Sequence, residues 1–388
     1  MKAAFVALMV AGVAWVPIAS GQDSFGLRSI GALGRAKVDE RIGVYERLLG
    51  GAPEDLRLQG GLIAAYLQKV RETGDRAYLD RASTLVDRML QTDGGDFSAL
   101  RFENEIDLQR HEFQAVAERA EDMVKYAPSD AGTWGNLGDA SMELGDYEQA
   151  GRAYRRMFML RPDLGSYNRL AYFRFVTGDA AQGIALMKEA VAAGDPQAEN
   201  TAWCWAELGD MYLKTGRVGE AAEAYQSALE LFPALHRASA GLGKVEAARG
   251  DTLAAIRNYE RAQSIVPLVE YAGALEDLYT RAGMAAKAKQ QRELIEVVEK
   301  LGLANGERTN RNLALVLADR GRDLEVAVRL METEIPTRGD VYTWDAFAWV
   351  LFKSGRLADA KAASAKALKL GTPEPMFYRH AKQIASAQ

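Results

Sequence analysis

The chain has 388 residues, of which 48% are hydrophobic and 26% charged, so it is long enough to bury a large core. Its formal net charge is −5, with acids and bases mixed along the chain, which argues against nucleic-acid binding because that needs a clustered basic face. The single cysteine, Cys204, excludes an internal disulfide and a cysteine-based metal cluster. Its place between Trp203 and Trp205 predicts a small buried hydrophobic residue.

Residues 1–21 are predicted to be a signal peptide. Lys2 gives a short positive start, residues 3–16 are apolar, and Ala19 and Gly21 stand at the −3 and −1 positions of a signal-peptidase site. The apolar run is too short to span a bilayer comfortably, and no later stretch is apolar enough to do so. We therefore expect an exported protein, periplasmic or secreted, with residues 22–35 as a flexible lead-in.

The first periodic segments of the chain predict helices. Residues 36–50 look like the second helix of a helical hairpin without its first, which would cap the N-terminal end. Two weaker hairpins follow, one around residues 62–86 and one over Phe97–Pro128.

The clearest hairpin is Thr201–Pro233. Trp205, Leu208, Gly209 and Tyr212 share one face of a first helix, which ends at Gly216, and Ala221, Tyr225 and Ala228 line the second helix. A helix pair this small cannot bury its apolar stripe alone and needs a like neighbour on each side.

The same anchor pattern recurs along the chain in register. Units start at Ala131, Leu164, Ala202, His236, Val269, Glu307 and Val341, in steps of 33, 38, 34, 33, 38 and 34 residues. The two long steps place candidate surface loops near Ala193–Asn200 and Gly302–Asn310. Residues 374–388 predict a final polar helix that covers the exposed end of the stack.

This spacing, W-x2-L-G-x2-Y followed by A-x3-aromatic and P on a 34-residue period, resembles the tetratricopeptide repeat. The resemblance covers residues 36–373, as about nine full repeats and an N-terminal half repeat. It implies an all-α, right-handed superhelical solenoid of antiparallel helix pairs. First helices would line a concave groove and second helices would form the convex back.

The resemblance also implies which positions face the groove: 2, 5, 9, 12 and 13 of each unit. These positions remain when positions 4, 7, 8 and 11 pack inward. The candidate partner-binding residues are Asp139, Asn168, Tyr172, Phe175, Trp203, Asp210, Lys214, Arg237, Lys244, Asp277, Arg281, Arg311 and Trp349. For Phe175 the alternative is packing against the next unit. The packing of the repeats does not require a tryptophan at position 203.

One binding mode of this family is a carboxylate clamp for acidic C-terminal tails. Asn136 fits its pattern, but Glu105 and Gly165 stand where the clamp has asparagine and lysine. We therefore predict no clamp.

Motifs for catalysis or cofactor binding are missing from the sequence. The three histidines, His111, His236 and His380, are far apart, and His236 is expected at a helix start on the surface. The run Gly241-x-Gly243-Lys244 lacks the strand and the Ser or Thr of a phosphate loop. We predict no enzyme, no metal and no cofactor.

The sequence thus favours an interaction scaffold that holds a peptide or protein in its concave groove outside the cytoplasm. The alternative is a structural or assembly protein that self-associates or tethers components of the cell envelope.

Overall fold

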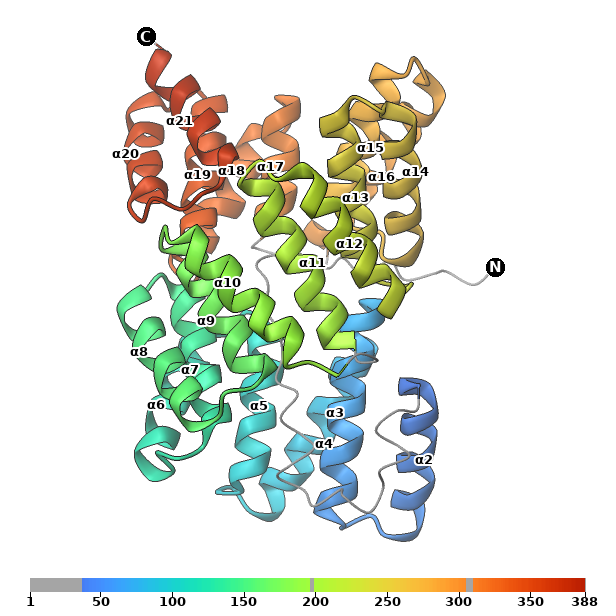
Figure 1. Ribbon diagram of the computed structural model, residues 1–388, viewed down its shortest axis with the longest axis vertical. Helices are drawn as coiled ribbons and strands as arrows, with labels where there is room; N and C mark the ends of the chain where they lie inside the picture. The colour runs from blue at the N-terminus through green and yellow to red at the C-terminus, as the bar shows by residue number, and fades with distance from the viewer. Residues whose placement is uncertain (1–36, 196–198, 305–309, 388) are drawn as a thin grey trace.

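The computed structural model describes residues 37–195, 199–304 and 310–387, and within these ranges the chain forms 20 helices and no strand (Figure 1). Consecutive helices pack as antiparallel pairs that stack into a right-handed superhelix, which confirms the predicted fold class. The signal peptide and lead-in expected before residue 36 lie outside the described residues.

Nine helix pairs follow a single N-terminal helix, α2 (Val38–Gly51). The first helices are α3 (Leu56–Thr73), α5 (Phe97–Gln109), α7 (Ala131–Leu144), α9 (Leu164–Val176), α11 (Glu199–Lys214), α13 (His236–Arg249), α15 (Val269–Arg281), α17 (Arg311–Arg320) and α19 (Val341–Lys353). The second helices are α4 (Ala77–Thr92), α6 (Phe113–Tyr126), α8 (Tyr147–Leu160), α10 (Ala180–Ala192), α12 (Val218–Leu231), α14 (Thr252–Ile265), α16 (Ala285–Ala304), α18 (Leu324–Glu334) and α20 (Leu357–Leu368). Helix α21 (Pro375–Ser386) closes the stack.

Two predicted unit boundaries differ from the structure. The unit expected from Ala202 begins three residues earlier, at Glu199, and α16 continues through Ala304 where a loop was expected from Gly302. The unit start expected at Glu307 lies outside the described residues, and α17 begins at Arg311.

Within several pairs, a Gly-Asp step makes the turn from first to second helix. Gly145 and Gly250 have φ values of 81° and 85°, a left-handed conformation that glycine adopts without steric cost. Asp146 and Asp251 then cap the second helix, because each carboxylate accepts a bond from a backbone N–H of the first turn. The dipeptide therefore ends one helix and starts the next.

The small anchor residues let neighbouring helices approach closely. The ring of Tyr225 is fully buried between α11 and α13, where a methyl group on Gly209 or Gly241 would collide with it. Its hydroxyl donates to Asp210 at 2.7 Å. The large and small anchors are thus complementary parts of one contact.

The superhelix is compact, because its C-terminal units reach back to the middle of the chain. We define the arm as residues 310–387, which contain α17–α21. Figure 1 shows the arm, in orange and red, against the green helices α7–α10. Helices α7, α9 and α11 end where α19 and α21 begin, and Phe377 of α21 shares an apolar cluster with Leu170 and Phe173 of α9. We name this contact the seam.

Candidate partner-binding surface

The inner face, made by the first helices, is held together by ion pairs between neighbouring units. Arg169 of α9 binds Asp139 of α7 through Nε and one terminal nitrogen, at 2.9 and 2.8 Å. Both side chains are buried, at 3% and 6% exposed. Arg237 of α13 likewise binds Glu207 and Asp210 of α11. These charged groups thus stabilise the stacking of the repeats.

A second buried network lies at the seam around Arg338. Its Nε is 2.7 Å from Glu143 and 3.3 Å from Asp340, and a terminal nitrogen is 3.4 Å from Glu334. Arg311 also binds Asp340, at 3.2 Å. Three carboxylates therefore share two guanidinium groups in a site sealed from water. Burial accordingly raises the pKa of Glu143 to about 7.

Five predicted groove residues are buried and have no surface to offer a partner: Asp139, Asn168, Phe175, Arg311 and Trp349. The amide nitrogen of Asn168 lies 3.5 Å from the sulfurs of Met187 and Cys204. Phe175 packs against α10, where Gly183 makes room for it. The alternative of packing therefore holds for Phe175, and the buried charges of this group serve the repeat contacts instead.

Five further groove residues are partly buried: Tyr172, Trp203, Asp210, Lys214 and Arg237. The guanidinium of Arg237 lies over the ring of Trp203, 4.8 Å from its centroid. Lys214 reaches across the seam to Glu374 and to the hydroxyl of Tyr342, both at 3.1 Å. Contacts within the chain therefore occupy most of the central groove.

Lys244, Asp277 and Arg281 are exposed on the inner face of α13 and α15. Lys244 is 51% exposed, although its ammonium is 3.5 Å from Asp210. The line of inner positions continues through Asp319 of α17, which is exposed and accepts a bond from Nε1 of Trp349 at 2.7 Å. It ends at Lys353 of α19, which is partly exposed and lies over the ring of Trp349. We name these five residues, Lys244, Asp277, Arg281, Asp319 and Lys353, the open row. They leave both signs of charge accessible.

Lys214 and Arg311 of the seam were predicted as groove residues, whereas Arg338 is a candidate that sequence reasoning did not single out. Arg338 lies between two helices, in a position that the repeat pattern does not define, and 195 residues separate it from Glu143. A repeat pattern reflects contacts between neighbouring units, so it cannot predict a contact between residues so far apart in the sequence.

His236 was predicted to lie on the surface and Cys204 to be buried, and only the prediction for Cys204 is confirmed. The Nδ1 atom of His236 lies 2.8 Å from the hydroxyl of Tyr271, and burial lowers its pKa to about 4, so this histidine is less exposed than expected. Cys204 is fully buried, and burial raises the pKa of its thiol far above the usual range. Among the described residues, no group of three or more His, Cys, Asp or Glu is placed to hold a metal ion.

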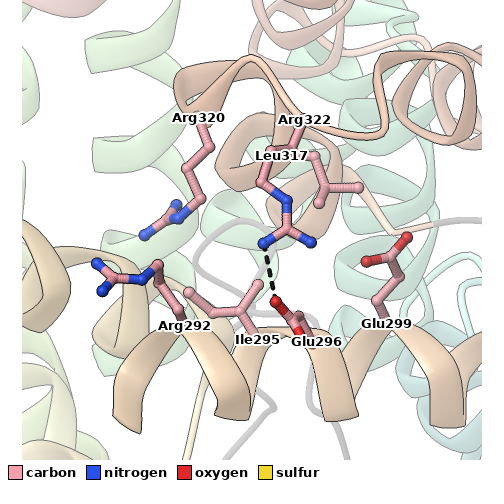
Figure 2. A pocket seen from close by; sticks show the side chains of 7 residues that line it. All are labelled: Arg292, Ile295, Glu296, Glu299, Leu317, Arg320 and Arg322. Atoms are coloured by element: carbon pink, nitrogen blue, oxygen red, sulfur yellow. Dashed lines mark hydrogen bonds and ion pairs between the residues drawn. The ribbon is translucent and has the colours of Figure 1, made fainter. Parts of the chain in front are cut away.

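A small hollow between α16 and α17 is shown in Figure 2. Arg322 bridges it to Glu296 at 2.9 Å, and Arg320 binds Glu276 beside it. Because these charged side chains form ion pairs with each other, we interpret the hollow as a junction between helices and not as a ligand site.

The repeats are matched by family models. Three models described as tetratricopeptide repeat match residues 131–164, 164–234 and 206–270. The chain is a tetratricopeptide repeat protein. No curated protein matches it in sequence. None of the helices in the described part of the chain is long and apolar enough to cross a membrane.

Solved structures share the repeat architecture. A crystal structure of the APC/C hetero-tetramer Cut9–Hcn1 matches with a TM-score of 0.54 and 16% identity, over 94% of this chain and 63% of that one. This tetratricopeptide repeat protein thus spans less than two thirds of that relative.

Two weaker similarities are with the human IFIT1 dimer with PPP-AAAA and with PilW, a type IV pilus biogenesis factor. The first has 14% identity, covers 89% of both chains and has a TM-score of 0.48. The second has 18% identity, covers 56% of this chain and 96% of that one, and has a TM-score of 0.44. Identities this low show a shared fold only, and no argument about this protein depends on these two.

Proposed function

We propose that this tetratricopeptide repeat protein is an interaction scaffold that binds an extended protein segment along the open row. The observation that supports this most directly is the contrast along the inner face. Ion pairs and the arm cover the units from α7 to α11, whereas Lys244, Asp277 and Arg281 are exposed on α13 and α15. An extended segment with charges of both signs would complement this row and fix its register.

Charge reversal tests the proposal. Lys244→Glu with Arg281→Glu is expected to reduce capture of the partner at least tenfold, because two attractive contacts become repulsive. The measurement is quantitative crosslinked pull-down from the host with the mature chain. Lys125→Glu with Lys289→Glu is the matched control, since both lysines are exposed on second helices. Equal losses in the two double variants would contradict the proposal.

Two partly buried aromatics extend the same test. Trp203→Ala or Tyr172→Ala should also weaken capture without unfolding the repeats, provided that the partner reaches beyond the open row. Unchanged capture in both would confine the partner to α13–α19.

The proposed location is outside the cytoplasm, periplasmic or secreted. Its support is the signal-like pattern of residues 1–21. Fractionation of host cells tests it, together with mass spectrometry of the mature N-terminus. Retention of Lys2 on a cytoplasmic chain would contradict it.

The second candidate function is self-association or tethering through the convex back. Tyr126 of α6 and Met159 of α8 favour it, because they are 86% and 73% exposed on second helices of adjacent pairs. A stable oligomer that buries Tyr126 and Met159 would support self-association through the back, whereas one that buries the open row would contradict the open scaffold.

A further inference from the structure

The arm is joined to the rest of the superhelix differently from any other unit. Among the described residues, α16 and α17 are the only helices adjacent in the chain whose backbones barely approach each other. The hollow of Figure 2 lies at this junction, and the ion pair between Arg322 and Glu296 that bridges it is solvent-exposed. Ile295 and Val298 of α16 share one apolar cluster with Leu317 of the arm, and Val269 of α15 belongs to the same cluster. The arm therefore rests on side chains of α15 and α16 without a close backbone contact between α16 and α17.

Helix ends rather than helix faces make much of the seam. The carbonyl oxygen of Gly339 packs against Gly145, and a methyl group added at Gly145 would lie 2.5 Å from that oxygen. Likewise, a methyl group on Gly178 would lie 2.7 Å from the carbonyl oxygen of Leu370. The arm thus touches the ends of α7 and α9 at two points where only glycine fits.

Polar contacts between these points are specific and few. Thr372 donates to the carbonyl oxygen of Val176 at 2.6 Å, and the backbone N–H of Val341 donates to the hydroxyl of Tyr147 at 2.8 Å. If the arm moved away, these polar groups and the ion-paired side chains of Arg338 and Lys214 would form hydrogen bonds with water instead.

We propose that the arm is a clasp that swings about the α16–α17 junction and closes over the ends of α7, α9 and α11. Opening would expose the apolar cluster around Phe377 and hydrate the few polar groups of the seam, but it would leave each helix pair intact. We therefore expect opening of the arm to cost less free energy than unfolding of the repeats. Opening would uncover Lys214 and the inner face beside it. Control of partner access by the clasp rests on the proposed function, whereas the opening itself does not.

Opening of the arm is tested by comparing Gly145→Ala with Gly216→Ala, a matched control, in the full chain. Both glycines follow a first helix with φ near +80°, so alanine strains the backbone equally at either position. Only Gly145 touches the arm, because nothing lies within 4 Å of a methyl group at Gly216. The two variants therefore differ only in the clash at the seam.

Hydrogen exchange followed by mass spectrometry is the primary readout. In Gly145→Ala, peptides covering residues 337–344 and 369–377 should exchange at least tenfold faster. Peptides of α11–α14 should keep their rates, and small-angle X-ray scattering should show a larger radius of gyration. Gly216→Ala should change none of these.

Thr372→Val provides a second variant if Gly145→Ala does not fold. It keeps the shape of the side chain and removes the bond to Val176, so the same seam peptides should exchange several-fold faster. If seam and repeat peptides accelerate together in either variant, the arm opens only by global unfolding and the clasp is refuted. Because no partner is present, failure here is distinct from failure of the proposed function.

Discussion

At the residue scale, pairing decides whether a charge on the inner face is structural or free. Asp139 and Lys244 occupy equivalent positions of their units, yet the first is buried against Arg169 and the second is half exposed. Burying a charge is tolerated only with a well-placed partner, because the lost hydration must be replaced. The same position can therefore stabilise the stack in one unit and face solvent in another.

Removing the charge of Asp139 should destabilise the protein strongly. Asp139→Asn leaves the buried Arg169 without the carboxylate that binds it, and we expect the free energy of unfolding to fall by about 3 kcal/mol in urea titrations. Asp122→Asn is the control, because Asp122 and Lys125 are exposed and solvent screens the attraction between them. Similar losses in both variants would contradict this assignment.

The seam network should make stability depend on pH through Glu143. Its pKa is about 7 in the folded protein, against a usual value of 4.5, so the folded state binds a proton that the unfolded state releases. The stabilisation is complete below the unfolded pKa and is lost as the pH rises from about 4.5 to 7. Arg338, Arg311, Asp340 and Glu334 face the same site.

Glu143→Gln should remove this contribution to the pH dependence. Between pH 5 and pH 7.5 the free energy of unfolding of the variant should fall less than that of the original chain, by at most about 3 kcal/mol. Urea titrations at the two pH values measure it. Glu148→Gln, which alters an exposed carboxylate, should leave the slope unchanged. Parallel slopes for Glu143→Gln and the original chain would rule out the raised pKa.

At the scale of the elements, glycine has opposite roles at different sites on the helices. Gly243 of α13 faces the ring of Tyr259, where a methyl group would come within 2.6 Å of a ring carbon. Gly219 of α12 has nothing within 4 Å of such a group. Close approach between helices therefore explains the first glycine and does not explain the second.

Alanine substitution separates the two glycines. Gly243→Ala should lower the free energy of unfolding by about 2 kcal/mol, because the helices must move apart. Gly219→Ala should raise it by up to about 1 kcal/mol, because alanine loses less backbone freedom on folding. Urea titrations of the two variants measure the difference. A stabilising Gly243→Ala would show that the contact with Tyr259 is loose.

At the scale of the whole molecule, return of the arm converts an extended stack into a compact body. A simple solenoid has contacts only between neighbouring units. Here Arg338, Thr372 and Glu374 also bind groups that lie two or more pairs earlier in the chain. Intramolecular contacts thus use much of the groove that an open superhelix would offer.

Light scattering should find a monomer mass for the mature chain, because the seam already covers the ends of α7, α9 and α11 within one molecule. Tyr126→Ser with Met159→Ser should then leave the mass unchanged. A dimer that the double substitution dissociates would favour self-association through the convex back.

The repeat pattern predicted the fold correctly from local chemistry. Trp205, Leu208, Gly209 and Tyr225 have fixed spacings within one unit, so a sequence read unit by unit reveals both helices and their packing. The glycine turns are equally local. The helix starts at Ala131, Leu164, His236, Val269 and Val341 followed from the same register.

The candidate site needed the tertiary structure, because the path of the superhelix decides which inner positions stay exposed. Small rotations between successive helix pairs accumulate until the arm meets α7–α11. The total rotation cannot be predicted from the spacing of residues in the sequence. Arg338 and Glu143 therefore carry no joint signal in the sequence, although they lie 2.7 Å apart. The sequence determined the repeat and its anchors, whereas only the assembled superhelix separated the buried Asp139 from the accessible Lys244.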